Sequence, residues 1–517
     1  PTAITRPHRT RQQPPPRPPQ QTGTKPTAIM AWGNTVGVAS WVDRLKRNDA
    51  TLTSVTVFRG RLFGPAQAAE VCDALRTTNT ALTELYASGH PMDAATTGLF
   101  ADMLAVNTTL RSLCVGDTEF GDAGLIALTP GIAASSSLES IDLENKGVGD
   151  DGARALGAAL ASKGCKALTS VNLSRNDNLG EAGVAAVCAG AAAGGILTTL
   201  SLAGIALTDE GCRALGELLA SRCPLRRLDL TDATGPGLVG GCGDAGTGAA
   251  HIAAGLAARA AAFAENNPNN NNGEGAAAAL GRLDALVMDG VLLGDSGAVA
   301  LAGGGGGRLP VGALSLQGCG IGMEGGAAIA RALVGSMTAV EEEEARRLGV
   351  EVLNLRNNKV GDAGAAALAA ALEAAGPKGG LQVLDVGSNG VGAVGAAELI
   401  RRAVGLQNLS LFGNEALGDE GLAAVLEAAS HGGRALKVLD IGGCGVEEAG
   451  LIRMCEALSA GAADADTAEE DAGDESSPAA AAAALQLLLL FPALETLVVG
   501  GNPGVQGDAW EAALGRL

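Results

Sequence analysis

Three glycine-rich segments match the spacing G-x-G-x-x-G, which in dinucleotide-binding proteins cradles a pyrophosphate at the start of a helix. Each follows an apolar run and precedes an Ala-rich run, as such a site requires. All three nevertheless fall in the same phase of a repeating pattern. Turn chemistry shared by the repeats therefore accounts for them, and we expect no cofactor site. The segments begin at Gly147, Gly320 and Gly390.

A second set of residues has the local sequence of a serine-protease centre. Gly294 opens the tetrad Gly-Asp-Ser-Gly, and His251 follows two alanines, as the nucleophile and histidine of such enzymes do. The same position of the repeating pattern carries Gly-Asp-Ala-Gly at Gly121 and Gly361, so the tetrad belongs to the repeat. We therefore predict no catalytic residues and a protein that is not an enzyme.

The cysteines and histidines show no metal-binding pattern. The ten Cys include no C-x-x-C pair, and none of the four His has a Cys or His partner at ligand spacing. We expect no metal site, and we expect thiols that stay reduced, as in a cytoplasmic protein.

Composition and charge exclude further classes of function. The 517-residue chain has a net charge of −20 and only 2% aromatic residues. Phosphate-rich surfaces of nucleic acids and membranes need clustered Lys and Arg, and base stacking needs aromatic side chains. The most hydrophobic run, Ala479 to Phe491, is shorter than the about twenty residues that span a bilayer. We expect neither a nucleic-acid nor a membrane partner.

The spacing L-x-x-L-x-L recurs, mostly every 25 to 31 residues, and this repeat decides the fold. A small polar residue, often Asn, stands eight positions after the first Leu in many units. After it come an apolar residue, then in many units a Gly-Asp-x-Gly tetrad, and then a run rich in Ala and Leu. The clear units start at Leu110, Leu138, Leu168, Leu197, Leu225, Leu283, Val311, Val350, Leu381, Leu406 and Leu436, and weaker ones at Leu52, Leu82 and Leu494.

This pattern has a direct physical interpretation. A short strand places its Leu side chains inward, and the Asn side chains form a ladder of hydrogen bonds where the chain leaves each strand. The Asp of the tetrad sits where a helix begins, as a cap or as a complement to the helix dipole. The helix returns antiparallel to its strand, so successive strands lie parallel.

These units resemble the ribonuclease-inhibitor-like class of leucine-rich repeats, which also occurs in Ran GTPase-activating proteins and in nod-like receptors. The resemblance covers Leu52 to Leu517. It implies an α/β fold: a curved solenoid, or horseshoe, of about fourteen repeats, with a parallel sheet on the concave side and helices on the convex side. The spacing G-x-x-x-x-G-K-[ST] is absent, so only the repeat domain of the receptors is shared.

The termini and inserts define the expected domain organisation. Residues 1–30 are Pro-rich and basic, and we expect a disordered leader, with an organellar transit peptide as the alternative. Residues 31–50 should form a capping helix, with Ser40 opening a capping box and Trp41 covering the core. The solenoid spans 51–517, with solvated inserts at 233–279 (Gly/Asn-rich) and 461–478 (acidic), and Ser477 as a candidate phosphorylation site.

Strand positions +2, +4, +6 and +7 after each first Leu should face the concave side. Nine acids and four bases fall there, so we expect a net negative face that binds a basic partner, and Cys114 should also face it. Aromatic residues and Arg are the usual anchors of such surfaces. The set comprises Phe58, Arg59, Glu84, Tyr86, Asp117, Asp142, Glu144, Arg175, Arg227, Asp229, Asp232, Asp289, Arg356, Asp385, Phe412 and Asp440.

The sequence thus predicts a non-enzymatic scaffold for protein–protein interaction, monomeric and cytoplasmic, with a cytoskeletal or ciliary complex as one candidate setting. The resemblance supplies one alternative, a GTPase activator of the Ran type acting on a small GTPase. The acidic segment 461–478 precedes another repeat here, whereas in that type it forms a tail. The negative charge supplies a second alternative, an inhibitor of a basic enzyme.

Overall fold

The structure is a computed structural model. It separates into two compact units, which we describe one at a time: an N-terminal unit, Arg11–Leu238 with Ala254–Leu286, and a C-terminal unit, Pro1–Thr10, Val239–Ala253 and Val287–Leu517. The Asn-rich run 267–272, the acidic segment with Ser477, and Trp32 and Trp510 lie outside the described residues. Those described are 3–5, 38–61, 63–238, 247–266, 281–303, 309–335, 349–376, 380–402, 404–459, 492–507 and 509.

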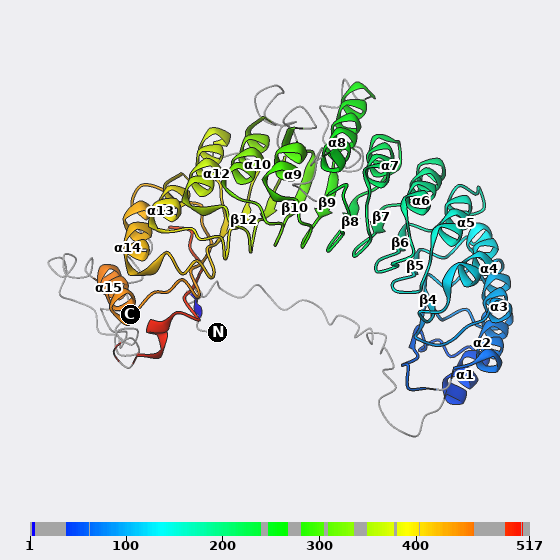
Figure 1. The fold of residues 1–517 in the computed structure, drawn as a ribbon. Coiled ribbons are helices and arrows are strands. Elements are labelled where there is room, and N and C mark those ends of the chain that lie inside the picture. Colours follow the sequence, from blue (N-terminus) through cyan, green and yellow to red (C-terminus); the bar gives the residue numbers. More distant parts are fainter. Residues whose placement is uncertain are drawn as a thin grey trace, which may run out of the picture. The chain divides into compact units, whose positions relative to one another are not determined.

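In the N-terminal unit short strands alternate with helices along the chain, and the helices lie on the convex side of the sheet (Figure 1). Neighbouring strands are parallel, with apolar inward positions opposite one another, such as Leu85 with Leu113. The elements are α1 (Val38–Lys46), β2 (Ser54–Thr56), α2 (Pro65–Thr77), β3 (Glu84–Ser88), α3 (Ala94–Leu104), β4 (Ser112–Gly116), α4 (Gly121–Ala134), β5 (Ser140–Asp142), α5 (Asp150–Leu160), β6 (Ser170–Asn172), α6 (Glu181–Gly194), β7 (Thr199–Ser201), α7 (Asp209–Ala220), β8 (Arg227–Asp229) and β9 (Leu283–Val287).

The C-terminal unit repeats this arrangement, with Leu353 opposite Leu384 and Leu384 opposite Leu409. Its last strand has a second neighbour, because β1 (Ala3–Thr5) pairs antiparallel with β15. The elements are α9 (Gly294–Gly303), β10 (Val311–Ser315), α10 (Met323–Gly335), β11 (Val352–Asn354), α12 (Gly361–Ala375), β12 (Val383–Asp385), α13 (Ala393–Arg402), β13 (Asn408–Ser410), α14 (Gly418–Ala429), β14 (Val438–Asp440), α15 (Glu448–Ser459), β15 (Thr496–Val498) and the 3-10 helix η3 (Pro503–Gln506).

One helix lies inside the predicted insert 233–279. Helix α8 (Thr247–Asn266) has residues in both units, and its side chains Ala249, Ile252 and Leu256 are fully buried. Its Arg259 is also buried and donates to the carbonyl oxygens of Cys223 and Leu225 at 3.0 and 2.8 Å. This part of the insert is therefore a helix that contributes to the core.

The repeat pattern places the core between sheet and helices. The first and fourth positions of the L-x-x-L-x-L units are buried throughout, as at Leu110 and Leu113, at most 1% exposed. Fourteen parallel strands, β2 to β15, and fourteen α-helices are described, which confirms the predicted α/β solenoid of about fourteen repeats.

Small residues let neighbouring helices approach closely. A Cβ added to Gly190 of α6 would clash with the backbone of Gly157 in α5, and one added to Gly157 would clash with the backbone of Ala186. Larger side chains at these positions would force the two helices apart. Part of the Gly- and Ala-rich composition is therefore a packing requirement of the stacked helices.

The N-terminal end of the core is covered by aromatic residues. Trp41 of α1 is 9% exposed and stacks on Phe63 with ring centroids 6.3 Å apart, and Phe63 meets the edge of His90 at 5.5 Å. The helix begins at Val38, so Ser40 is its third residue and not the N-cap that the sequence indicated. Among the described residues, no helix is both long and apolar enough to cross a membrane.

Candidate partner-binding site

The predicted asparagine ladder is present and fixes the loops that follow the strands. In the N-terminal unit the amide of Asn176 donates to the carbonyl oxygens of Leu143 and Leu173 at 2.9 and 2.8 Å. Its Oδ1 accepts from the main-chain N–H groups of Lys146 and Val148, both at 3.0 Å. This one side chain therefore joins its own repeat to the preceding one. It also fixes the main chain at Lys146.

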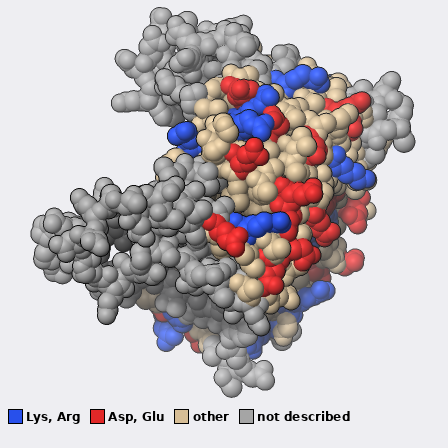
Figure 2. All heavy atoms as spheres, turned by 90° about the vertical axis from the view of Figure 1, so that its left-hand side faces the viewer, with Lys and Arg blue, Asp and Glu red and all other residues tan. Residues whose placement is uncertain are grey.

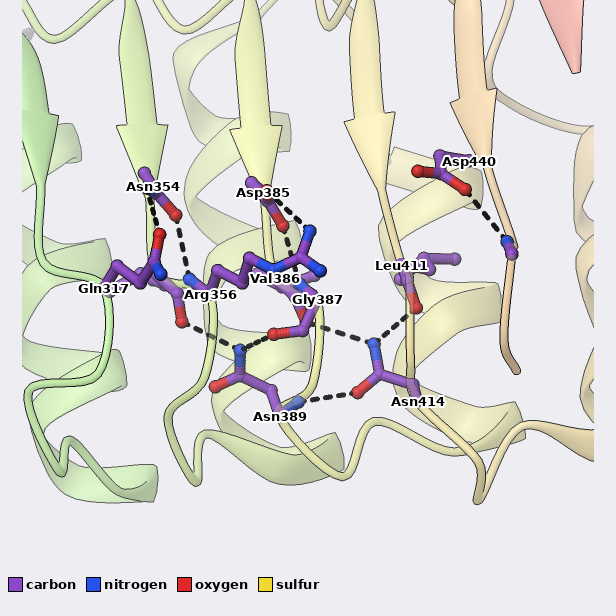
Figure 3. A network of polar contacts seen from close by, with 12 residues as sticks. Gln317, Asn354, Arg356, Asp385, Val386, Gly387, Asn389, Leu411, Asn414 and Asp440 are labelled. Atoms are coloured by element: carbon purple, nitrogen blue, oxygen red, sulfur yellow. Dashed lines mark hydrogen bonds and ion pairs between the residues drawn. The ribbon is translucent and has the colours of Figure 1, made fainter. Parts of the chain in front are cut away.

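The same ladder runs through the C-terminal unit (Figure 3). Asn389 donates its amide to Leu355 O and Gly387 O, and its main-chain N–H donates to Asn414 Oδ1 at 2.8 Å. Asn414 in turn donates to Leu411 O at 2.7 Å. Buried amides with several partners each make this edge of the sheet rigid.

Other residue types take the ladder position in some repeats. Cys319 Sγ donates to Met288 O at 3.1 Å, and His90 Nε2 donates to Val57 O at 3.2 Å. Both bonds join a repeat to the one before it, as the Asn amide does. The burial of His90 therefore follows from a structural role.

The Asp of each tetrad caps a helix, but the helix belongs to the next repeat. Asp362 Oδ1, in the first turn of α12, accepts from the main-chain N–H groups of Gly392 and Gly395 at 2.7 and 3.0 Å, where α13 begins. Asp295 does the same for Gly322 and Gly325. The carboxylate occupies the place that a phosphate would take in a nucleotide site, so the glycine spacing serves capping.

The predicted concave residues of the N-terminal unit lie on β2 to β8 and the loops that follow them. Phe58 is 43% exposed, Tyr86 and Glu84 are half-buried on β3, and Arg175 is exposed. Arg175 Nε lies 3.6 Å from Glu144 Oε1.

The acids at the strand ends have a structural task as well. Asp142 Oδ1 accepts from the main-chain N–H of Glu144 at 3.0 Å, and Asp229 Oδ1 accepts from that of Thr231 at 3.1 Å. In the same way, Asp385 and Asp440 accept from the main-chain N–H groups of Gly387 and Gly442, two residues further along the chain. Asp therefore recurs here partly because it forms these turns. A count of the acidic residues thus overstates how many carboxylate oxygens are free to bind a partner.

Four of the predicted residues meet at a polar pocket of about 310 Å³ in the N-terminal unit. They come from the end of β5 and from the loops after β2, β4 and β5. Its lining combines exposed side chains, such as Arg59 and Ser88, with the half-buried carboxylates of Asp117, Asp142 and Glu144. The lining residues are Arg59, Ser88, Gly89, Asp117, Thr118, Asp142, Glu144, Asn145 and Lys146.

Five of the lining residues were not predicted from the sequence, and Lys146 is the charged one among them. It is 2% exposed, and its Nζ donates to Ser88 Oγ at 2.5 Å, so the side chain passes from the repeat of β5 back to β3. The signal was available, since Lys146 stands eight positions after Leu138, where other repeats carry Asn or Cys. A charged residue at a ladder position is the feature that marks the site.

Cys114 lies on the strand side of β4, as its position predicts, but it is only 3% exposed. Burial, reinforced by the Asp142 carboxylate, raises the pKa of its thiol to about 11, although the Lys146 ammonium opposes that shift. Cys114 therefore lies on the side that the sequence predicts, but neighbouring side chains cover its thiol.

A second group of predicted residues lies in the C-terminal unit, where Figure 3 labels Arg356, Asp385 and Asp440. The guanidinium of Arg356 lies over the ring of Phe412, 4.6 Å from its centroid, and 3.9 Å from Asp385 Oδ2. Burial raises the pKa of the Asp440 carboxyl, and the charge of Asp385 adds to that effect. The cation–π contact holds the Arg356 guanidinium over the Phe412 ring.

Asp289 joins the same unit through side-chain bonds. Its Oδ1 accepts from Ser315 Oγ at 2.6 Å and from the N–H of Gln317 at 2.8 Å. Asn354 donates to Ser315 Oγ at 3.0 Å, and its own Oδ1 accepts from the N–H of Arg356. The polar groups on β10 and β11 are thus satisfied by one another.

Acidic residues are not confined to the strand ends. Figure 2 shows red and blue side chains close together on an outer face of the C-terminal unit. Ion pairs on the helices there include Arg402 with Glu398 at 2.8 Å and Arg453 with Asp419 at 2.8 Å. Charge alone therefore does not identify the partner-binding face. Among the described residues, no His, Cys, Asp or Glu cluster is placed to hold a metal ion.

The family model described as Leucine Rich repeat matches this chain at residues 106–128, 164–188, 350–369, 381–399 and 406–426. These stretches fall on the strand, ladder and helix segments described above. The chain therefore contains leucine-rich repeats, and they are similar to those of ribonuclease inhibitors.

Two curated relatives of this leucine-rich repeat protein are the ribonuclease inhibitors of Sus scrofa and Mus musculus, 31% and 30% identical over 170 residues. The match spans 32% of this chain and 37% of each relative. Among solved structures, it is similar to a chain of the Rad7 and Elc1 complex in yeast, with 13% identity and a TM-score of 0.41 over 79% of this chain and 84% of that chain. At that TM-score, nothing about function follows from the likeness.

Proposed function

We propose that this protein is a non-enzymatic scaffold that binds a protein partner on the strand side of its N-terminal unit. The observation that carries the proposal is the polar pocket between the loops after β2 to β5, with Phe58 in the loop after β2 and Tyr86 on β3. Aromatic residues beside charged groups are the usual anchors of protein interfaces. The ladder-fixed loops of the pocket lower the cost of ordering on binding.

The finer part of the proposal concerns the charge of the partner. Asp117 and Asp142 each use Oδ1 in a turn, which leaves Oδ2 of each carboxylate for a partner, whereas Oδ2 of Asp229 is paired with Arg227 at 3.2 Å. With a net charge of −20, the protein attracts basic partners over long range. We therefore propose a partner with a basic surface, steered by these acids and anchored by the aromatic residues.

A second candidate function is favoured by the relatives. Both are named ribonuclease inhibitors, and an acidic repeat surface suits a basic enzyme. Titrating a basic ribonuclease with the protein tests this candidate directly. Stoichiometric loss of ribonuclease activity at nanomolar protein supports it, and undiminished activity at a large excess of protein excludes it.

We also propose that the protein works in the reducing cytoplasm. The nine described Cys are all buried, and thiols such as Cys319 and Cys444 donate hydrogen bonds in the ladder. A thiol at a ladder position must remain reduced to donate. Fractionation of cells expressing the tagged full chain tests this placement.

The binding surface is tested by quantitative affinity capture from the native lysate. Wild type and Tyr86→Ala are compared by mass spectrometry, and each protein lost with the variant is purified and its Kd measured. The proposal predicts a partner whose Kd rises at least about fivefold. If every captured partner binds both proteins equally, this face is not the binding site.

A further inference from the structure

The side chain of Lys146 is buried. Among the described residues it makes one hydrogen bond, to Ser88 Oγ, and no ion pair. Burying a charge is costly unless it is paired. A positive charge therefore lines the pocket, and none of the described carboxylates is bonded to it.

Ser88 carries this charge to the surface of the pocket. Its oxygen accepts from Lys146 Nζ, and the residue itself is exposed. A hydroxyl that accepts from an ammonium is polarised, so its own proton becomes a stronger donor. The Ser88 hydroxyl is thus a donor whose strength depends on Lys146.

Arg59 supplies a second cation on the same side. The stem of its side chain packs against Gly89, where an added Cβ would meet Cγ and Cδ of Arg59 at 3.2 Å. Within the described part of the chain the guanidinium makes no ion pair. A planar guanidinium next to a polarised hydroxyl matches the two oxygens of a carboxylate.

Two of the three acids that line the pocket have partners outside it. Asp142 Oδ1 accepts from Asn172 Nδ2 at 3.0 Å, and Glu144 contacts Arg175 at 3.6 Å. The pocket thus brings the cations of Arg59 and Lys146 together with the carboxylates of Asp117, Asp142 and Glu144.

We propose that this pocket binds a carboxylate that lies next to a basic group, with Arg59 and Ser88 holding the carboxylate and Asp117 and Asp142 facing the basic group. The carboxylate comes from an acidic side chain or from a free chain end of the partner. This inference rests on the proposed function, since it names what the same surface recognises. Lys146 is a positioning residue, because it acts through Ser88.

Methyl NMR of the full chain tests the inference, with the Thr118 methyl as reporter because Thr118 lines the pocket. The first probes are acetyl-Glu-Lys-amide and acetyl-Gln-Lys-amide, which differ only in the carboxylate. We expect the first to shift the Thr118 signal saturably and the second to bind at least about tenfold more weakly. Free Lys-Glu, with its charged chain end, distinguishes a terminal from a side-chain carboxylate.

Two lysine variants provide the matched comparison. Lys146→Met should weaken acetyl-Glu-Lys-amide at least about tenfold, whereas Lys359→Met, an exposed Lys in the C-terminal unit, should change nothing. Because Lys146→Met could disturb the fold, Arg59→Gln gives a second, surface variant, which should also weaken the peptide.

Equal shifts from the Glu and Gln peptides, or no shift up to their solubility, would overturn the carboxylate inference. That result leaves the proposed function standing if Tyr86→Ala still weakens the protein partner. If instead the peptide binds as expected but Tyr86→Ala binds the partner like wild type, the proposed function fails and the carboxylate inference stands.

Discussion

Asp150 Oδ1 accepts hydrogen bonds from the main-chain N–H groups of Gly183 at 2.9 Å and Gly180 at 2.8 Å, where the helix of the next repeat begins. A residue at the start of one helix thus caps its neighbour. The neighbouring Asp151 lies in the same turn of α5 but points to solvent, 71% exposed, and pairs with Arg154. Stability of the stack therefore depends on contacts between repeats.

These two acids give a matched stability experiment. Asp150→Ala leaves two helix-start N–H groups without an acceptor, so we expect it to lower the free energy of unfolding by about 1–2 kcal/mol. Asp151→Ala removes only an exposed ion pair and should change it by less than about 0.5 kcal/mol. Urea unfolding of both variants measures the difference, and equal losses would contradict the capping role.

The sequence indicated that these Asp cap helices, but not which helix. The distance from Asp150 to Gly183 is a property of stacked repeats, and no local pattern contains it. The ladder was easier to predict, because Asn176 and Asn389 recur eight positions after an inward Leu. The repeat period and the inward positions were sufficient for the fold.

Adjacent strand residues test the register of the core. Leu353 is fully buried, and its truncation to Ala opens a cavity, so Leu353→Ala should cost about 2–5 kcal/mol. Val352 on the same strand is 37% exposed, and Val352→Ala should cost less than about 1 kcal/mol. Denaturant unfolding of the two variants compares them, and a reversed order would show that the assigned register is wrong.

Trp41 covers the N-terminal end of the core. Trp41→Ala removes the stack on Phe63, and we expect faster hydrogen exchange in the repeats of β2 and β3 before any change near β12. Hydrogen exchange resolved by segment measures this gradient. Loosening of equal size along the whole chain would argue against a capping role.

Burial of the thiols makes stability depend on pH. The pKa of Cys114 is raised to about 11 in the fold, whereas an unfolded Cys titrates near ~8.5. The folded state therefore holds more protons between these values, and the stabilisation present below ~8.5 is lost as the pH rises toward about 11. We expect Cys114→Ala to reduce the fall in stability between pH 8 and pH 10, measured by urea unfolding. An unchanged fall would mean that this thiol does not contribute.

The pocket could not be assembled from the sequence. Asp142, Glu144 and Arg59 were found because their strand positions point to the concave side. Lys146 was not found, since its four-carbon side chain reaches two repeats back to Ser88, and only the folded chain shows that direction. Cys114 was placed on the correct face, but the folded chain was needed to show that neighbouring side chains cover it.

The central claim is that a protein partner docks on the strand side of the N-terminal unit. The most direct measurement is the Kd of the captured partner for Phe58→Ala with Tyr86→Ala and, as control, for Ile126→Ala, a 46% exposed residue on helix α4 of the same unit. The account predicts at least about a fivefold higher Kd for the aromatic variant and an unchanged Kd for the control. An unchanged Kd for the aromatic variant together with a weakened control would contradict it and assign binding to the helical face.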